Sequence, residues 1–190
     1  MAEFYAGTLE SALVQTRDGE RAMAEAMYWK EITVQWGESD PFGLVYYPRI
    51  VAWFNDTEHD FFRTIGYPID QMIRRDRTTF VMGEIHFRFI GPAAYGDRVA
   101  TTVTLTKIGE RTLHWACKAR NAVTGAPVTE GKATRVYARI NEDGTLNSAV
   151  IPDAMRKAML QSGQLSHLKQ KIEKDPEYRH AEPGAKRRRR

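Results

Sequence analysis

The sequence has very little cysteine: Cys117 is the only one among 190 residues. A single cysteine cannot form an internal disulfide or a cysteine-based zinc site, which favours a reducing compartment. The chain also has no uncharged stretch near the roughly 20 apolar residues that a membrane-spanning helix needs. Residues 1–27 lack the basic start and apolar run of a secretory signal. We therefore predict a cytoplasmic protein without a membrane span.

Several catalytic signatures are missing as well. The sequence contains no Gly-x-Ser-x-Gly elbow, which disfavours a serine esterase of the α/β-hydrolase type. It contains no phosphate-binding loop and no dinucleotide fingerprint. The five histidines are scattered and, with one cysteine, form no metal-ligand pattern. We predict chemistry that uses neither a cofactor nor a metal.

The net positive charge of the chain comes entirely from its C-terminal end. The formal net charge is +4, but residues 186–190 carry five positive charges, so the first 185 residues sum to −1. A nucleic-acid surface needs basic residues clustered on the folded body. The distribution therefore predicts no specific nucleic-acid partner. The basic end itself is open to three interpretations: a solvated terminus, weak attraction to anionic lipid or nucleic acid, or weak attraction to an anionic substrate.

The chain is rich enough in apolar and aromatic residues, 42% and 11%, to build a folded core. Its length suits one domain with extensions. We divide it into an N-terminal arm (residues 1–27), a central domain (28–143), a C-terminal helical extension (144–175) and a disordered basic tail (176–190).

The central domain shows one strand, one long helix and then about four strands. Ile32, Val34 and Trp36 alternate with polar residues, as in a half-buried strand. Pro48 opens a helix whose apolar face continues to Ile65. Segments in which apolar and polar residues alternate follow, and they are joined at turns such as Gly109-Glu110 and Thr124-Gly125. Short connections imply antiparallel pairing. We predict an α+β fold in which an antiparallel sheet wraps around one central helix.

The loop between the first strand and the helix contains the strongest candidate site. Asp40 lies in a Gly/Pro-rich loop a few residues before the helix start at Pro48. A carboxylate facing the free N–H groups of a helix start could attack a carbonyl and stabilise the resulting oxyanion. Alternatively, Asp40 only stabilises a turn, which is what most loop aspartates do.

The segment Asp40-Pro-Phe-Gly-Leu-Val-Tyr-Tyr-Pro48, followed by Trp53-Phe54, resembles the signature of the 4-hydroxybenzoyl-CoA thioesterase family of hotdog-fold proteins. Gly91-Pro-Ala-Ala-Tyr-Gly-Asp97 is similar to the family's lead into its third strand. The resemblance covers roughly residues 28–141. It implies the hotdog fold, thioester hydrolysis without a cofactor, and a homodimer or homotetramer with sites between subunits.

The resemblance also implies residue roles. Asp40 falls on the catalytic carboxylate, which acts as nucleophile or general base, and Tyr47 on the backbone N–H that polarises the thioester carbonyl. Tyr46 and Trp53 fall on the acyl pocket. Asn55 falls where one aromatic-CoA thioesterase has an acid that helps to read the substrate ring, a departure that puts a 4-hydroxy substituent in doubt.

Three charged residues complete the predicted substrate site. Glu58 lies on an apolar helical face, where an unpaired acid is costly to bury. We expect it to line a groove or subunit contact, paired with a base such as His59, Arg63 or a partner residue. Another branch of the fold uses a helix glutamate for catalysis, which is the alternative. Lys107 and Arg111 flank the Gly109-Glu110 turn, where similar enzymes place cations for the nucleotide of coenzyme A; the alternative is an ordinary charged hairpin.

The sequence thus predicts an acyl-CoA thioesterase that releases a free acid and coenzyme A, and an aromatic acyl group is one candidate. Two alternatives stay open. The substrate could be an acyl group on acyl carrier protein, or the chain could bind acyl-CoA without hydrolysing it. A hotdog lyase is disfavoured, because no histidine lies near Asp40.

Overall fold

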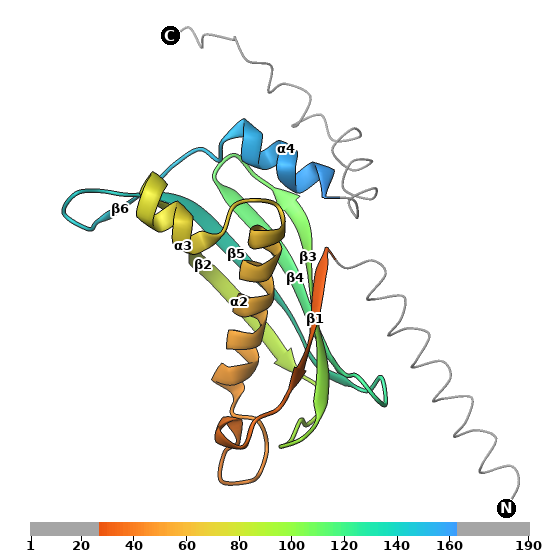
Figure 1. Cartoon of the computed structure of the whole chain (residues 1–190). Coiled ribbons are helices and arrows are strands. Elements are labelled where there is room, and N and C mark those ends of the chain that lie inside the picture. Colours follow the sequence, from red (N-terminus) through yellow and green to blue (C-terminus); the bar gives the residue numbers. More distant parts are fainter. Residues whose placement is uncertain (1–26, 163–190) are drawn as a thin grey trace, which may run out of the picture.

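The structure, a computed structural model, describes residues 27–162. Figure 1 shows a sheet crossed by one long helix. In chain order, the elements are β1 (Tyr28–Thr33), the 3₁₀ helix η1 (Trp36–Glu38), α2 (Tyr47–Thr64), α3 (Ile69–Gln71), the π-helical turn η2 (Met72–Asp76), β2 (Thr78–Phe89), β3 (Arg98–Ile108), β4 (Thr112–Asn121), β5 (Pro127–Ile140), β6 (Leu146–Ser148) and α4 (Asp153–Gln161).

The sheet is antiparallel throughout, in the order β1-β3-β4-β5-β2, and β6 pairs with one end of β5. Helix α2 lies across one face of this sheet (Figure 1). The arrangement confirms the predicted α+β architecture with a sheet around one central helix. The sheet ends at β1 on one side and at β2 on the other, so both have one edge without a strand partner within residues 27–162.

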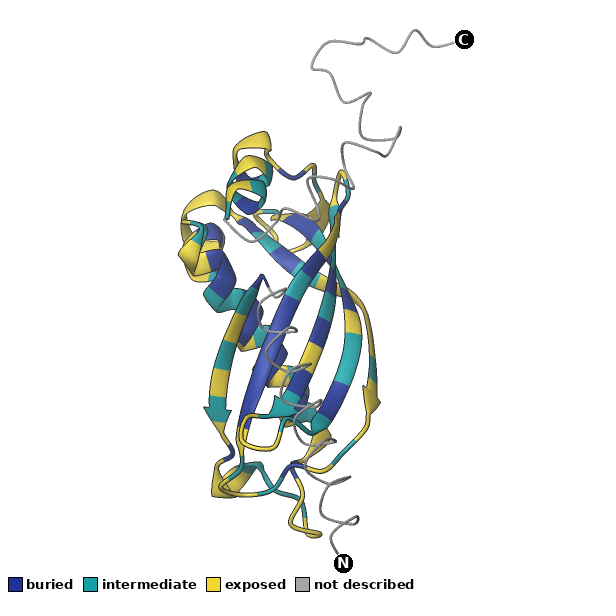
Figure 2. Cartoon of the chain, turned by 90° about the vertical axis from the view of Figure 1, so that its right-hand side faces the viewer, coloured by how far each residue is buried: buried dark blue, intermediate teal, exposed yellow. Residues whose placement is uncertain are grey.

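The core lies between α2 and the sheet because residues alternate along each strand. On β4, Leu113, Trp115 and Cys117 are buried toward the helix, and the intervening side chains are more exposed. Figure 2 shows this alternation along the strands. Phe61 and Phe62 of α2 both contact the Trp115 ring, with centroid distances of 5.6 and 6.1 Å.

The helix and hairpins follow the sequence prediction closely. Helix α2 begins at Tyr47, one residue before Pro48, and ends at Thr64 ahead of Gly66, whose φ of +85° suits glycine. The β3–β4 turn falls at Gly109-Glu110, and the β4–β5 turn includes Thr124-Gly125.

The prediction of a strand through Trp36 was wrong. β1 ends at Thr33, and Trp36 lies in η1 with 78% of its surface exposed. The cause is local: the Glu38 carboxylate accepts the Gln35 backbone N–H at 2.7 Å and turns the chain into a 3₁₀ helix. Trp36 then packs edge-on against Tyr95.

The C-terminal segment adds a strand as well as a helix. α4 begins at Asp153, inside the predicted helical extension, and residues 146–148 form β6. Ile151, Met155 and Met159 are buried in the same core as the sheet and α2. These three residues of the predicted extension thus share the core of the central domain, and the division of the chain at residue 143 stays a prediction. Most of the predicted arm, part of the extension and the basic tail lie outside the described residues. Within residues 27–162, no helix is long and apolar enough to cross a membrane.

Candidate active site

The loop before α2 is held by the segment that leads into β3. The Val45 backbone N–H donates to the Ala93 carbonyl at 2.8 Å, and Leu44 forms a β-bridge with Ala94. Gly91 lets the start of this segment pack closely against β5, because a Cβ there would lie 2.5 Å from the carbonyl oxygen of Pro127. The two motifs noted in the sequence are therefore neighbours in the fold, and one supports the other.

Asp40 organises this loop and keeps one carboxylate oxygen free. Its Oδ1 accepts the backbone N–H groups of Phe42 at 2.9 Å and Leu44 at 3.2 Å. The Asp40 N–H donates to the Leu44 carbonyl, and Gly43 adopts a φ of +79° in between. Within residues 27–162, Oδ2 has no hydrogen-bond donor. Asp40 can thus stabilise the turn with one oxygen and react with the other.

The start of α2 presents one unused backbone donor. The Tyr46 N–H donates to the Glu38 carbonyl and the Arg49 N–H to the Tyr46 carbonyl, both at 2.8 Å, and Pro48 has no N–H. The Tyr47 N–H has no acceptor within the described part of the chain. It lies at the positive end of an 18-residue helix. Such a donor suits an oxyanion.

Glu38 connects this loop to the body of α2, a role that sequence reasoning missed. Its Oε1 accepts the Trp53 indole N–H at 2.9 Å, and its Oε2 accepts the Gln35 N–H. The only signal in the sequence was an acid two residues before Asp40. Trp53 is 4% exposed. Its observed contact is with Glu38, and its predicted place in the acyl pocket stays a prediction.

Several aromatic side chains lie at the start of α2 and in the loop before it. Tyr46 and Tyr47 are exposed, and their rings are in edge contact at 5.1 Å. The Tyr47 ring also lies 6.2 Å from that of Phe89, at the end of β2. Phe42, in the loop, is 87% exposed. An apolar, partly aromatic surface therefore adjoins the start of α2, as the pocket prediction for Tyr46 requires.

Two predicted substrate residues, Asn55 and Glu58, take part in a network about two to three turns along α2 from Tyr47. Glu58 and Arg135 of β5 are 4% and 6% exposed. The Arg135 Nε donates to both Glu58 carboxylate oxygens at 3.0 Å, and its Nη2 donates to Glu58 Oε2 and to Asn55 Oδ1, both at 2.8 Å. Burial raises the pKa of Glu58, and Arg135 opposes this. The base that pairs with Glu58 is thus Arg135, and neither His59 nor Arg63.

Lys107 and Arg111 do not approach Asp40 within one chain. They flank the β3–β4 turn, which contacts the segment before α4: the Ile151 N–H donates to the Glu110 carbonyl. In Figure 1, α4 and the start of α2 lie at opposite ends of the molecule. Arg111 donates to the Ser148 carbonyl and hydroxyl at 3.1 and 3.2 Å.

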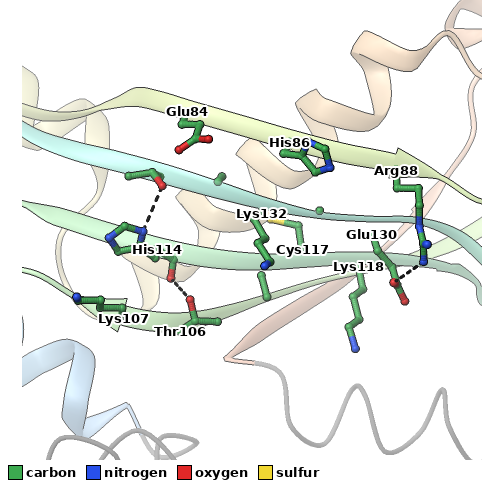
Figure 3. A pocket seen from close by; sticks show the side chains of 14 residues that line it. Glu84, His86, Arg88, Thr106, Lys107, His114, Cys117, Lys118, Glu130 and Lys132 are labelled. Carbon is green, nitrogen blue, oxygen red and sulfur yellow. Dashed lines mark hydrogen bonds and ion pairs between the residues drawn. The ribbon is translucent and has the colours of Figure 1, made fainter. Parts of the chain in front are cut away.

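Lys107 instead contributes to a polar hollow of about 1060 Å³ on the sheet (Figure 3). Lys118 and Lys132 lie on neighbouring strands of this hollow, and Arg88 pairs with Glu130 at 3.6 Å. The His114 ring lies between two threonine hydroxyls, those of Thr112 and Thr134. No residue of the Asp40 loop lines the hollow, which has the polar composition of a solvated sheet face.

The described residues offer no competing chemistry. No cluster of His, Cys, Asp and Glu within residues 27–162 could hold a metal ion. Cys117 is buried, and burial raises the pKa of its thiol to about 12, so it is not a nucleophile. The roles of the Asp40 carboxylate and the Tyr47 N–H in catalysis stay predictions.

Comparisons with known proteins agree with this fold. Residues 34–159 match the model of the thioesterase-like superfamily. The 1,4-dihydroxy-2-naphthoyl-CoA thioesterase from Synechocystis is 16% identical, with a TM-score of 0.64 over 70% of this chain and 94% of that one. The 4-hydroxybenzoyl-CoA thioesterase from Pseudomonas sp. strain CBS-3 is 17% identical, with a TM-score of 0.63 over 68% and 96%. A gentisyl-coenzyme A thioesterase is 21% identical, with a TM-score of 0.61 over 69% of this chain and 98% of that one. No curated protein sequence matches the chain.

Proposed function

The chain belongs to the thioesterase-like superfamily and is accordingly a thioester hydrolase; from this premise we propose that it hydrolyses acyl-CoA, with Asp40 as the catalytic carboxylate. The observation that supports this best is that two groups seven residues apart in the sequence both lack a hydrogen-bond partner within residues 27–162. These are the free Oδ2 of Asp40 and the free N–H of Tyr47 at the start of α2. Together they supply a nucleophile or base and an oxyanion donor.

The proposed reaction begins with the thioester carbonyl oxygen on the Tyr47 N–H. In one version, Asp40 Oδ2 attacks the carbonyl carbon, the C–S bond breaks, and coenzyme A leaves as thiolate. Water then cleaves the mixed anhydride, which releases the acid and restores the carboxylate. In the other version, Asp40 takes a proton from the water that attacks the carbonyl directly. In both, the N–H stabilises the negative oxygen of the tetrahedral intermediate.

An aromatic acyl group suits the surroundings of this pair. The rings of Tyr46, Tyr47 and Phe89 adjoin the helix start and can stack on a planar acyl group. The three structurally similar thioesterases named above all act on aromatic acyl groups, as their names state. Lys107 and Arg111 remain candidates for binding the phosphates of coenzyme A. Because they lie far from Asp40 of their own chain, they would bind a coenzyme A whose acyl group lies at Asp40 of a second copy.

We propose that two copies pair along β2. This strand has 12 residues, one edge without a strand partner within residues 27–162, and exposed apolar side chains at Met82, Ile85 and Phe89. A long apolar edge invites pairing with another strand. Two copies of β2 paired antiparallel about a two-fold axis would bring the β3–β4 turn of one copy to the same end as the Asp40 loop of the other.

The test is thiol release from aromatic and aliphatic acyl-CoAs, beside the same acyl groups on acyl carrier protein. The proposal predicts release from acyl-CoA, fastest with an aromatic group. Thiol release only from the acylated carrier protein would show that the substrate is an acyl carrier protein and that acyl-CoA is not hydrolysed. Tight binding without release would make the chain a sensor. A cytoplasmic location also stays a prediction, to be checked by fractionation.

A further inference from the structure

The polar hollow on the sheet has a small residue at its centre. Residues alternate along β4, so Ala116 and Lys118 point away from α2, whereas Trp115 and Cys117 are buried toward it. The strand register places Lys132 of β5 directly beside Ala116. Because the side chain of Ala116 is only a methyl group, the longer side chains around it form the rim of this cavity of about 1060 Å³ (Figure 3).

Lys132, on this rim, has no acidic partner. Its neighbours in the register are His86 on β2 and Ala116 on β4, and neither carries a negative charge. Glu84, an acid of the same hollow, lies beside Thr134 in the next row along β5. Within residues 27–162, no ion pair joins Lys132 to any acid. Its positive charge is therefore not compensated across the strands, where opposite charges are the favourable arrangement.

Lys118 is the second cation of this kind. It lies beside Glu130 in the register, but the Glu130 carboxylate is 3.6 Å from the guanidinium of Arg88. No ion pair joins Glu130 to Lys118 within the described part of the chain. Two residues further along β4, the Nε of Arg120 is buried without a hydrogen-bond acceptor. This part of the sheet face thus carries more positive charge than its acids neutralise.

The ammonium groups of Lys118 and Lys132 can reach one ligand. The two residues are diagonal neighbours across β4 and β5, which sets their Cα atoms about 8 Å apart. A lysine side chain is flexible and about 6 Å long, so both ammonium groups can meet over Ala116. Figure 3 shows Lys132 in the middle of the hollow and Lys118 toward the end that holds Arg88 and Glu130. A ligand with two or more negative charges would balance both lysines.

We propose that this hollow binds a diphosphate group, free or as part of a nucleotide, between Lys118 and Lys132. Ammonium groups bind phosphate oxygens as compact point charges, through charge-assisted hydrogen bonds. The site lies on the face of the sheet away from α2, and its described lining includes no residue of the Asp40 loop. It does not require Lys107, which lies toward the other end of the hollow (Figure 3). It is a second site, separate from the proposed catalytic one.

The test is calorimetric titration of the full chain with inorganic pyrophosphate and with ADP. We expect one bound pyrophosphate per chain. Lys118→Gln and Lys132→Gln should each raise its Kd about tenfold, since each removes a charge-assisted hydrogen bond. ADP with a similar Kd would place the diphosphate of a nucleotide in the hollow, and pyrophosphate alone would limit the site to the free anion; either result supports the site. A Kd that neither lysine variant changes would overturn the proposal.

Two further variants separate this site from general attraction between charges. Ala116→Leu fills the centre of the hollow and changes no charge, so it should also raise the Kd about tenfold, with an unchanged melting temperature as evidence of folding. Arg189→Gln combined with Arg190→Gln removes two positive charges from the C-terminal end. This control should bind pyrophosphate as the wild type does. Weakened binding in the control alone would assign the anion to the basic end and overturn the proposal.

Coenzyme A distinguishes this site from the proposed function. We expect its Kd to be the same with and without saturating pyrophosphate, because the two bind at separate places. Competition between them would make the hollow part of the coenzyme A site and overturn the inference. No binding of coenzyme A would count against the proposed function and leave the diphosphate site standing, because that site is measured without it.

Discussion

At the residue scale, the sequence motif led to the two residues of the proposed reaction and missed the side chains that support them. Asp40 and Tyr47 were found because they lie in one short segment with a recognisable order. Glu38 was passed over because its partner, Trp53, is 15 residues away on the helix. Arg135 is 77 residues from Glu58. Which residues pair over such separations depends on how β5 is aligned with α2 in the fold. A local sequence pattern carries no information about that alignment.

Cys117 allows a test of the packing at this scale. Its buried thiol has a pKa raised to about 12, against 9.0 ordinarily. A thiol reagent at pH 8 should therefore not label the native protein and should label it at once in denaturant. Because the folded state holds the proton more tightly, the free energy of unfolding should fall as pH rises from about 9 toward 12. Rapid labelling of the native protein would contradict this packing.

At the scale of elements, periodicity and turn residues predicted α2, its ends and the hairpins. They did not predict η1, where the Glu38 side chain overrides strand alternation. They also missed α3 and η2, the short helical turns that join α2 to β2. These elements depend on contacts of single side chains and lack a repeating pattern. The Glu58–Arg135 pair joins the middle of helix α2 to β5.

Breaking that pair on one side should destabilise the protein strongly. Arg135→Met leaves the Glu58 carboxylate buried and unpaired, and we expect a loss of about 3–5 kcal/mol in the free energy of unfolding. The double variant Glu58→Leu with Arg135→Met removes both charges and should recover most of this loss. Denaturant unfolding of both variants measures the difference. A double variant as unstable as Arg135→Met would contradict the argument.

At the scale of the whole molecule, the residues proposed to bind coenzyme A and the residue proposed to react with the thioester lie far apart within one chain. The cations Lys107 and Arg111 lie beside the β3–β4 turn, and Asp40 lies at the other end of α2 (Figure 1). The sequence could suggest an oligomer only through its family resemblance. The structure adds a physical reason to expect an oligomer. Strand β2 has one edge without a strand partner within residues 27–162 and carries exposed apolar residues, of which Phe89 contacts the Tyr47 ring.

A charge on this edge should separate the copies. Ile85 is 40% exposed on β2, and Ile85→Glu would place like charges near each other across the two-fold axis. We expect sedimentation to show a dimer in the wild type and a monomer in the variant, with thiol release lost. Val123→Glu, a similar change in the exposed β4–β5 turn, is the matched control and should alter neither. An Ile85→Glu dimer with full activity would show that β2 is not the contact.

The most direct test of the central claim is the rate of thiol release by Asp40→Asn. An asparagine keeps the Oδ1 that accepts the Phe42 and Leu44 N–H groups, so the loop is preserved. It replaces only the free Oδ2, the atom proposed to react. We predict a fall in kcat of about a thousandfold or more, with thermal stability unchanged and with Asp56→Asn, on the exposed side of α2, as active as the wild type. Full turnover by Asp40→Asn would contradict the account.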